Sequence, residues 1–303
     1  MKRRHFLWYS FLFLSGCGTA VTNNTNNASN SSASSNAQKP LRFTVTDVQG
    51  LENLKQQYEP FRQAWSQVLQ QPVEFVPVNG YTEAAAALRL DRVDIALSGP
   101  SEYVLIRTRT EATPIVAITR PNYHSAVVVP AESPIQSLDE LKNKEIAMRE
   151  IGSTSGHIGP TGILLEAGLD PKTDYQAKML GDRGSLAALA NREVDAWAGP
   201  WLDYQQFLQR ENISADDYRM VKKGPPLPND VFMASSFMDK NTIADIRDRT
   251  LANQQKLIDI LATREKKYEQ SQLVAAQDTD YDPIRNVYRA IGQGDFLNSE
   301  GQS

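Results

Sequence analysis

The stretch GSTSGHIGP, residues 152–160, places three hydroxyl side chains in succession between two glycines. It follows a predicted strand at 145–148 and opens a predicted apolar helix. The start of a helix leaves backbone N–H groups unpaired and carries a partial positive charge, so it can bind an anion. Ser153, Thr154 and Ser155 add hydroxyl donors, and the glycines let the backbone approach a ligand closely. The stretch therefore predicts a site for a tetrahedral oxyanion held by uncharged donors.

Other functions fit this stretch less well. Helix capping favours serine and threonine but needs only one hydroxyl. A phosphate-binding NTPase loop requires a lysine that is absent here, and a nucleophile elbow requires G-x-S-x-G, whereas this order is G-x-x-S-G. His124 and His157 have no carboxylate or second histidine at metal-ligand spacing. We expect no catalytic residue, no metal and no cofactor, although a hydrolase with Ser153 or Ser155 as nucleophile remains an alternative.

Outward from this stretch, short β-rich runs alternate with longer helical ones, which predicts an α/β fold with parallel βαβ units. Ligands of such sheets bind beyond the carboxyl ends of the strands. The turns at 98–100, 152–156 and 199–200 all follow a strand and open a helix, so we expect them at that edge. The predicted strands are 41–46, 73–78, 93–97, 115–119, 125–129, 145–148, 176–180, 194–198 and 231–235, and the further helices are 51–69, 82–89, 137–142, 185–192, 202–210, 242–270 and 282–291.

The first 17 residues have the features of a bacterial lipoprotein signal peptide. A basic start precedes an apolar stretch at 6–14 and the sequence Leu14-Ser15-Gly16-Cys17, which predicts lipidation of Cys17. A short membrane anchor is the alternative, although the apolar stretch is short for a bilayer. Arg3-Arg4 also resembles a twin-arginine export motif. We expect residues 18–39, rich in Asn, Ser, Thr and Ala, to form a flexible tether that holds the folded part in the periplasm near the membrane.

The charge balance restricts the partners. The chain has 32 Lys and Arg against 36 Asp and Glu residues, a formal charge of −4. Removal of the basic residues of the signal peptide leaves 29 against 36. An acidic chain lacks the basic footprint of a nucleic-acid-binding protein, so we expect no nucleic acid as partner. The negative net charge is compatible with an anionic small ligand, because hydrogen-bond donors close to the ligand act against the electrostatic field of the whole chain.

Several short motifs, taken in order, make the chain resemble the phosphate/phosphite/phosphonate-binding proteins that feed ABC importers. The resemblance covers about residues 41–270, and its motifs are Asn79-Gly80-Tyr81, Ser98-Gly99-Pro100, Tyr123-x-Ser125, Ser153-Thr154-Ser155-Gly156, Val194-Asp195-Ala196 and Pro228-Asn229-Asp230. It implies a type II periplasmic-binding-protein fold, with lobe 1 at 41–124 and 231–303, lobe 2 at 125–230, and a two-segment hinge. It also implies a monomeric solute-binding lipoprotein that delivers a small phosphorus oxyanion to an ABC permease and its ATPase.

The resemblance also implies roles for single residues. Ser153, Thr154 and Ser155 would hold the phosphorus oxygens, and Tyr81 and Tyr123 would close the cavity. Asp230 would accept from a protonated oxygen or another donor of the ligand. Further ligand contacts are expected from Ser98, Tyr103, His157, Arg183 and Asp203.

The chain departs from the family where residues 181–184 replace a histidine and Trp201-Leu202-Asp203 replace a glutamate. These departures favour phosphite, phosphate or methylphosphonate over long aminophosphonates. The alternatives are a sulfonate or thiamine-like ligand, a sensor input domain, and a scaffold lipoprotein.

Overall fold

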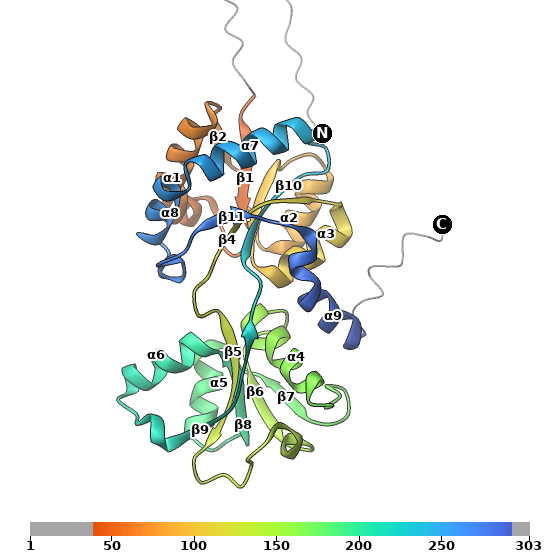
Figure 1. The fold of residues 1–303 in the computed structure, drawn as a ribbon, viewed down its shortest axis with the longest axis vertical. Helices are drawn as coiled ribbons and strands as arrows, with labels where there is room; N and C mark the ends of the chain where they lie inside the picture. Colours follow the sequence, from red (N-terminus) through yellow and green to blue (C-terminus); the bar gives the residue numbers. More distant parts are fainter. Residues whose placement is uncertain (1–38, 293–303) are drawn as a thin grey trace, which may run out of the picture. The chain divides into compact units, whose positions relative to one another are not determined.

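The computed structural model describes residues 39–292 (Figure 1). The predicted signal peptide, the lipidation of Cys17 and nearly all of the predicted tether lie outside these residues. Within them the chain forms two sheets, each covered by helices on both faces.

The first sheet has six strands in the order β11-β4-β10-β3-β1-β2. β1 pairs in parallel with β2 and β3, whereas β10 is antiparallel to β3 and β4. Because β10 runs against β3, its first residue, Asp230, lies beside the end of β3. The bounds are β1 (Leu41–Val45), β2 (Val73–Phe75), β3 (Ile95–Ser98), β4 (Thr113–Ile118), β10 (Asp230–Ala234) and β11 (Leu273–Ala275).

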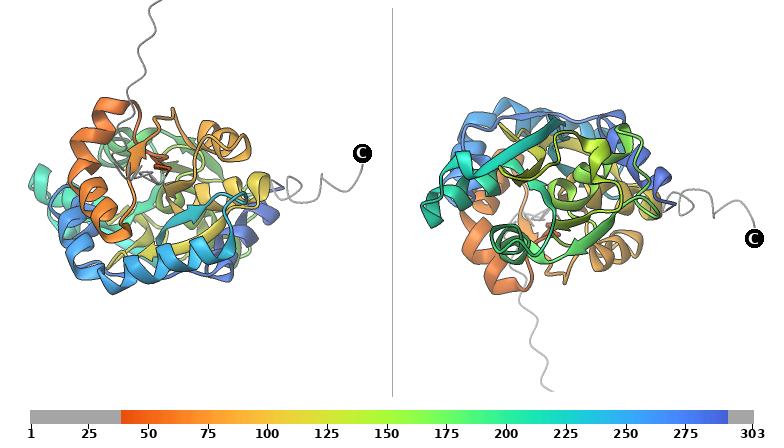
Figure 2. Two further views of the ribbon diagram at one scale, coloured as in Figure 1. Left: turned by 90° about the horizontal axis from the view of Figure 1, so that it is seen from above. Right: turned by 90° about the horizontal axis from the view of Figure 1, so that it is seen from below.

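Helices cover both faces of this sheet, as the two views of Figure 2 show. On one face, aromatic side chains of the sheet and of α1 form the centre of the core: Phe43 lies edge-on to Trp65, with ring centroids 5.4 Å apart, and Phe232 stacks on Phe61 at 5.7 Å. α1 (Leu51–Leu69), α7 (Lys240–Ala252) and α8 (Gln254–Ala262) cover this face, whereas α2 (Tyr81–Arg89), α3 (Pro100–Thr110) and α9 (Asp282–Ala290) cover the other. We call this sheet with its helices lobe 1.

The second sheet has the strand order β7-β6-β8-β5-β9 and, with its helices, forms what we call lobe 2. β6 is parallel to β7 and β8, so the turns that follow these three strands lie at one edge of the sheet. The strands are β5 (His124–Pro130), β6 (Glu145–Met148), β7 (Gln176–Met179), β8 (Ala196–Pro200) and β9 (Tyr218–Pro226), and the helices are α4 (Gly159–Glu166), α5 (Gly181–Ala190) and α6 (Trp201–Glu211).

Two chain segments connect the lobes, one between β4 and β5 and one between β9 and β10 (Figure 1). They lie side by side, because the N–H of Leu227 donates a 2.9 Å hydrogen bond to the carbonyl oxygen of Tyr123. The predicted lobe boundaries lie one residue beyond these segments, because His124 already begins β5 of lobe 2 and Asp230 already begins β10 of lobe 1.

Several elements differ from the sequence predictions. The single helix predicted at 242–270 is instead α7, α8 and a short 3-10 turn at Lys266–Tyr268. Asn253 separates the two helices, and asparagine is poor inside a helix because its side chain competes for backbone hydrogen bonds. The sequence pattern predicts neither β9 nor β11. For β9 the reason is its edge position and the two prolines at its end, Pro225 and Pro226. The sheets are also mixed, not wholly parallel, because β4, β5, β9 and β10 form antiparallel pairs.

Candidate functional site

A cavity of about 370 Å³ lies between the two lobes, where β3, β6 and β10 bring their ends together. Lobe 2 contributes the stretch from Arg149 to Ser155. Lobe 1 contributes residues from the turn after β3 together with Asp230 and Lys267, and the segment between the lobes contributes Arg120 and Tyr123. Six predicted ligand-binding residues therefore line one cavity: Tyr81, Tyr123, Ser153, Thr154, Ser155 and Asp230.

The hydroxyl-rich stretch forms a helical turn at this cavity. Residues Thr154–Ile158 make one π-helical turn that continues directly into α4. Ser153 caps the turn, since its Oγ accepts a 3.3 Å hydrogen bond from the N–H of Gly156. Gly152 has a φ of 88°, a left-handed conformation that glycine adopts without strain. A side chain at Gly156 would meet the side chain of Arg149 at 2.5 Å, so this glycine permits close packing of the turn on the strand before it.

The three hydroxyls have different partners. Thr154 Oγ1 accepts a 3.0 Å hydrogen bond from the N–H of Ser101 in α3, and Ser153 Oγ caps the turn. The carbonyl oxygen of Ser155 accepts from Ser125 Oγ at 2.8 Å, which fixes its backbone. In residues 39–292 the Ser155 hydroxyl itself makes no hydrogen bond, although the residue is buried and lines the cavity. Ser155 is therefore the hydroxyl most available to a ligand.

Asp230 is the centre of a buried charge network. Its Oδ1 lies 3.3 Å from Nη1 of Arg120, and its Oδ2 accepts a 2.9 Å hydrogen bond from the hydroxyl of Tyr268. Lys267 Nζ lies 3.7 Å from the same Oδ2. Burial by itself would raise the pKa of Asp230, but Arg120, Lys267 and Tyr268 together hold it below its usual value. Asp230 is thus an ionised side chain whose two oxygens both have partners within the protein.

Arg120 is held at the cavity wall by two contacts. Besides its ion pair with Asp230, its guanidinium carbon lies 3.6 Å from the centroid of the Tyr123 ring. Stacking on an aromatic ring fixes the plane of the guanidinium and leaves its remaining N–H groups free to meet an oxyanion. Burial favours loss of its proton, but Asp230 raises the pKa of Arg120, so the side chain stays charged.

Arg149 pairs with carboxylates at one edge of the lobe 2 sheet. Its guanidinium contacts Asp182 at the start of α5, lies 3.4 Å from Asp203 at the start of α6, and lies 3.3 Å from Glu150. The three carboxylates come from the turns after β6, β7 and β8, which meet at one edge of the sheet. Asp203 therefore acts on the cavity through Arg149 and is not among its lining residues. Burial raises the pKa of Asp203, and Arg149 opposes that change.

The other predicted contacts lie elsewhere. Ser98 is buried at the end of β3, where its hydroxyl has no hydrogen-bond partner in residues 39–292, and its neighbour Gly99 lines the cavity. Tyr103 is fully buried in lobe 1 and donates to Asp278 at 2.7 Å. His157 accepts from the N–H of Gly152 at 3.1 Å, and burial lowers its pKa, so it is a neutral brace of the turn. Arg183 lines a separate cavity on lobe 2, between α5 and α6.

Several lining residues were not expected from the sequence, among them Ser101, Glu102, Arg120, Arg149 and Lys267. They come from distant parts of the chain and belong to no short motif. A single arginine or lysine in a sequence is usually solvated at the surface, so spacing gave no signal for Arg120 or Lys267. Only for Ser101 and Glu102 was a signal present, since they directly follow the Ser98-Gly99-Pro100 turn that was assigned to the ligand edge.

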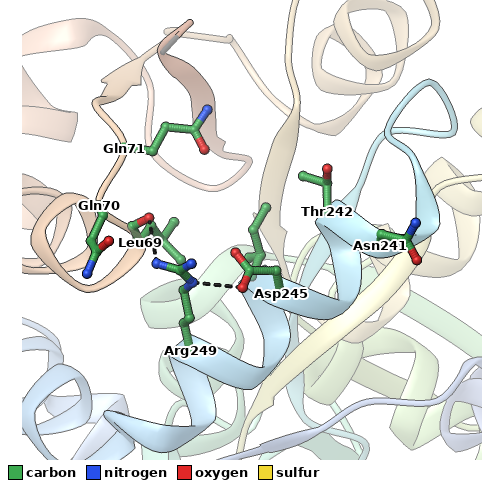
Figure 3. Close-up of a pocket in the computed structure, with 8 residues that line it drawn as sticks. Leu69, Gln70, Gln71, Asn241, Thr242, Asp245 and Arg249 are labelled. Carbon is green, nitrogen blue, oxygen red and sulfur yellow. Dashed lines mark hydrogen bonds and ion pairs between the residues drawn. The ribbon is translucent and has the colours of Figure 1, made fainter. Parts of the chain in front are cut away.

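A second cavity, of about 360 Å³, lies on lobe 1 between the end of α1 and the start of α7 (Figure 3). Its one cationic residue, Arg249, donates to Asp245 at 2.8 Å and to the carbonyl oxygen of Leu69 at 3.3 Å. The charge of Arg249 is thus neutralised within lobe 1, and none of the predicted ligand-binding residues lies here.

Two searches of residues 39–292 gave negative results. None of the helices described there is long and apolar enough to cross a membrane. Across the same range, no group of three or more His, Cys, Asp or Glu side chains is arranged to hold a metal ion.

The chain is similar to known proteins in sequence and in fold. A family model described as "ABC transporter, phosphonate, periplasmic substrate-binding protein" matches residues 43–281. The phosphate-import protein PhnD of Mycolicibacterium smegmatis is 25% identical over 263 residues, which are 79% of this chain and 82% of that protein. Among solved structures, PhnD1 of Prochlorococcus marinus in complex with methylphosphonate gives a TM-score of 0.61 at 18% identity, covering 84% of this chain and 99% of that one.

The aliphatic sulphonate binding protein SsuA of Escherichia coli gives a TM-score of 0.59 at 16% identity, covering 86% of this chain and 89% of that one. The two mixed α/β sheets and these structural matches define the type II periplasmic-binding-protein fold. Since the family model spans most of the chain, the protein belongs to the family of periplasmic, phosphonate-type substrate-binding proteins of ABC transporters.

Proposed function

We propose that this protein captures a small phosphorus oxyanion, such as phosphite, phosphate or methylphosphonate, and delivers it to the permease and ATPase of an ABC importer. One observation carries the proposal: the turn 153–155 and the guanidinium of Arg120 line the same cavity from different parts of the fold. Hydroxyls and backbone N–H groups at the start of a helix supply uncharged donors, and Arg120 supplies a fixed cation.

The structure supports a capture mechanism that uses both lobes. Lobe 2 offers the turn 153–155, and lobe 1 offers Tyr81, Asp230 and Lys267 across the cavity. A ligand that contacts both walls favours the arrangement in which the walls are near each other. Its differential affinity for that arrangement shifts the population toward a closed form, which the permease can distinguish from the open one.

The direct test is calorimetry with phosphite, phosphate and methylphosphonate, with sulfate and an aliphatic sulfonate as comparison ligands. Saturable heat with at least one phosphorus oxyanion supports the proposal, and no heat and no thermal shift with any of them contradicts it. A sulfonate is the second candidate, because SsuA shares the fold and uncharged donors also suit a sulfonate group. Tighter binding of the sulfonate than of every phosphorus oxyanion would replace the first candidate by the second.

We also propose a binding role without catalysis. In residues 39–292, no hydrogen bond joins the hydroxyl of Ser153 or Ser155 to a histidine, carboxylate or lysine side chain that would act as its base. His157, the nearest histidine in sequence, uses Nδ1 for the N–H of Gly152. Turnover of a phosphate or carboxylate ester that disappears in Ser155→Ala would contradict this role.

Attachment to the periplasmic face of the membrane through lipidated Cys17 is a separate proposal, and it rests on the lipobox alone. Mass spectrometry of the protein extracted from membranes tests it: acyl groups on an N-terminal Cys17 support the proposal. A soluble protein cleaved elsewhere contradicts it. Cys17→Ala should release the protein from the membrane fraction with ligand binding unchanged.

A further inference from the structure

The carboxylates that line the cavity are not equivalent. Asp230 is paired with Arg120 at 3.3 Å, and Glu150 is paired with Arg149 at 3.3 Å. Asp47 is paired with Lys267 at 2.9 Å. Glu102 is the fourth lining carboxylate, and in residues 39–292 it has no ion pair. Each cation of the lining already has a carboxylate within 4 Å, so the cavity holds one carboxylate more than its cations neutralise.

Glu102 is fixed in position at the cavity wall. It lies in the first turn of α3, directly after Ser101, whose N–H bonds Thr154 of the opposite lobe. The hydroxyl of Thr46, at the end of β1, donates to Oε2 of Glu102. Burial raises the pKa of Glu102, and the charges of Asp47 and Asp230 raise it further, whereas the Thr46 hydroxyl and the N–H of Gly99 lower it. A carboxylate in this setting gains by accepting a proton.

The ionisable side chains around Glu102 do not supply this proton, so it must come with the ligand. Asp230, the acceptor predicted from the sequence, has both oxygens engaged by Arg120 and Tyr268. Other titratable or charged groups line the cavity or lie on α2, α9 and the turn 154–158, which pack against α3, and in residues 39–292 no ion pair joins any of their cations to Glu102: Asp47, Tyr81, Glu83, Arg89, Arg120, Tyr123, Arg149, Glu150, His157, Lys267, Asp282, Arg285, Tyr288 and Arg289.

We propose that Glu102 is a specificity-determining residue that shares one proton with an oxygen of the bound anion, so that the site takes oxyanions with an ionisable P–OH group and rejects sulfate and sulfonates. This inference rests on the proposed function. A phosphorus oxyanion carries one proton near neutral pH in part of its population, and that P–OH donates to the Glu102 carboxylate. Sulfate and sulfonates carry no proton near neutral pH, so Glu102 must either take a proton from solvent or face them as an unpaired negative charge, and both weaken their binding.

The proton makes the proposal measurable. At a pH above the second ionisation of phosphite or methylphosphonate, and high enough to ionise Glu102 in the free protein, only the complex holds a proton between the ligand and Glu102. Binding must then take up about one proton from the buffer. Calorimetry of the folded protein with phosphite or methylphosphonate, in two buffers of different ionisation enthalpy, counts that proton. The wild-type protein should take up about one, and should bind sulfate at least roughly tenfold more weakly than phosphite.

The matched variants are Glu102→Gln and Glu52→Gln. Both remove one negative charge from the first turn of a helix, but Glu52 is exposed at the start of α1, in lobe 1 and outside the cavity lining. In Glu102→Gln the side-chain amide can donate a hydrogen bond to an anion that carries no proton. Proton uptake on binding should therefore fall to near zero, and the preference for phosphite over sulfate should shrink by roughly tenfold. Glu52→Gln should keep the wild-type values.

The outcomes separate this inference from the proposed function. If the wild type binds no phosphorus oxyanion, both fail. If it binds one with no proton uptake, or if Glu102→Gln keeps the uptake and the preference over sulfate, the role of Glu102 is overturned and the proposed function stands. Should Glu102→Gln fail to fold, as judged by thermal unfolding, the proton count and the sulfate comparison of the wild type decide the question alone.

Discussion

The N–H of Ser101 donates a 3.0 Å hydrogen bond to Oγ1 of Thr154, so the start of α3 in lobe 1 is joined directly to the oxyanion-type turn of lobe 2. The side chains continue this contact: Ser101 Oγ donates to the carbonyl oxygen of Gly152 at 2.6 Å and lies 2.7 Å from Thr154 Oγ1. A residue of one wall thus fixes a predicted ligand donor of the other wall. We therefore expect closure of the lobes and formation of the proposed site to be coupled.

Ser101→Ala tests this coupling. It removes the two side-chain contacts and keeps the backbone N–H. The closed arrangement of the lobes should therefore lose about 1 kcal/mol of stability relative to the open one, and the apparent ligand affinity should fall roughly fivefold. Calorimetry gives the affinity, and small-angle scattering with and without ligand gives the opening. Ser66→Ala is the control, since Ser66 bonds Gln71 within lobe 1 and its loss should leave affinity unchanged. Equal effects of the two variants on affinity would exclude the coupling.

The three hydroxyls of the turn should separate into structural and ligand-binding roles. Ser153→Ala removes the cap of the turn and should lower the free energy of unfolding by about 1 kcal/mol. Ser155→Ala removes a hydroxyl with no partner in residues 39–292, so it should leave stability nearly unchanged but weaken oxyanion binding by roughly tenfold. Urea unfolding and calorimetry on the same samples measure both quantities. Unchanged affinity in Ser155→Ala would remove this residue from the site.

Asp230→Asn should destabilise the fold, because it leaves Arg120 buried without a charge partner, at a cost of about 3–5 kcal/mol. The pKa of Asp230 is lowered in the folded state, so its contribution to stability is present above its unfolded pKa and is lost as pH falls through the folded value. The difference between wild type and variant should thus be full at neutral pH and shrink in acid, below about pH 4. Urea unfolding at several pH values checks this, and a difference independent of pH would contradict the assignment of an ionised Asp230.

Two glycine substitutions should have opposite effects on stability. A Cβ at Gly159 would lie 2.3 Å from Ser125 Oγ and 3.0 Å from the carbonyl oxygen of Thr154, so Gly159→Ala should displace the turn and cost about 2 kcal/mol. A Cβ at Gly184, within α5, would meet Leu180 Cβ at an ordinary 3.5 Å. Gly184→Ala should therefore stabilise the helix by about 0.5–1 kcal/mol. Thermal unfolding compares the two, and a stable Gly159→Ala protein with unchanged ligand affinity would show that the turn tolerates movement.

The sequence determined the parts of this protein that depend on neighbours along the chain. Amphipathic spacing located α1 with its observed bounds, Leu51 to Leu69, and alternation of strands and helices gave the α/β class. The order of serine, threonine and glycine at 152–156 was enough to place a turn and a helix start after β6, because helix starts and glycine conformations are local properties. The short motifs were likewise enough to indicate the family that the match over residues 43–281 shows.

Only the tertiary structure decided which charges line the cavity between the lobes. Arg120 and Lys267 are 147 positions apart in the numbering of the chain, yet both contact Asp230, and the pairing engages the carboxylate that the family resemblance had assigned to a ligand proton. The same packing leaves Glu102 unpaired at the wall. The physical reason is that the electrostatic field at a buried site is the sum of the charges that strand order and lobe contact bring together. The spacing of residues within one short motif predicts neither the strand order nor the lobe contact.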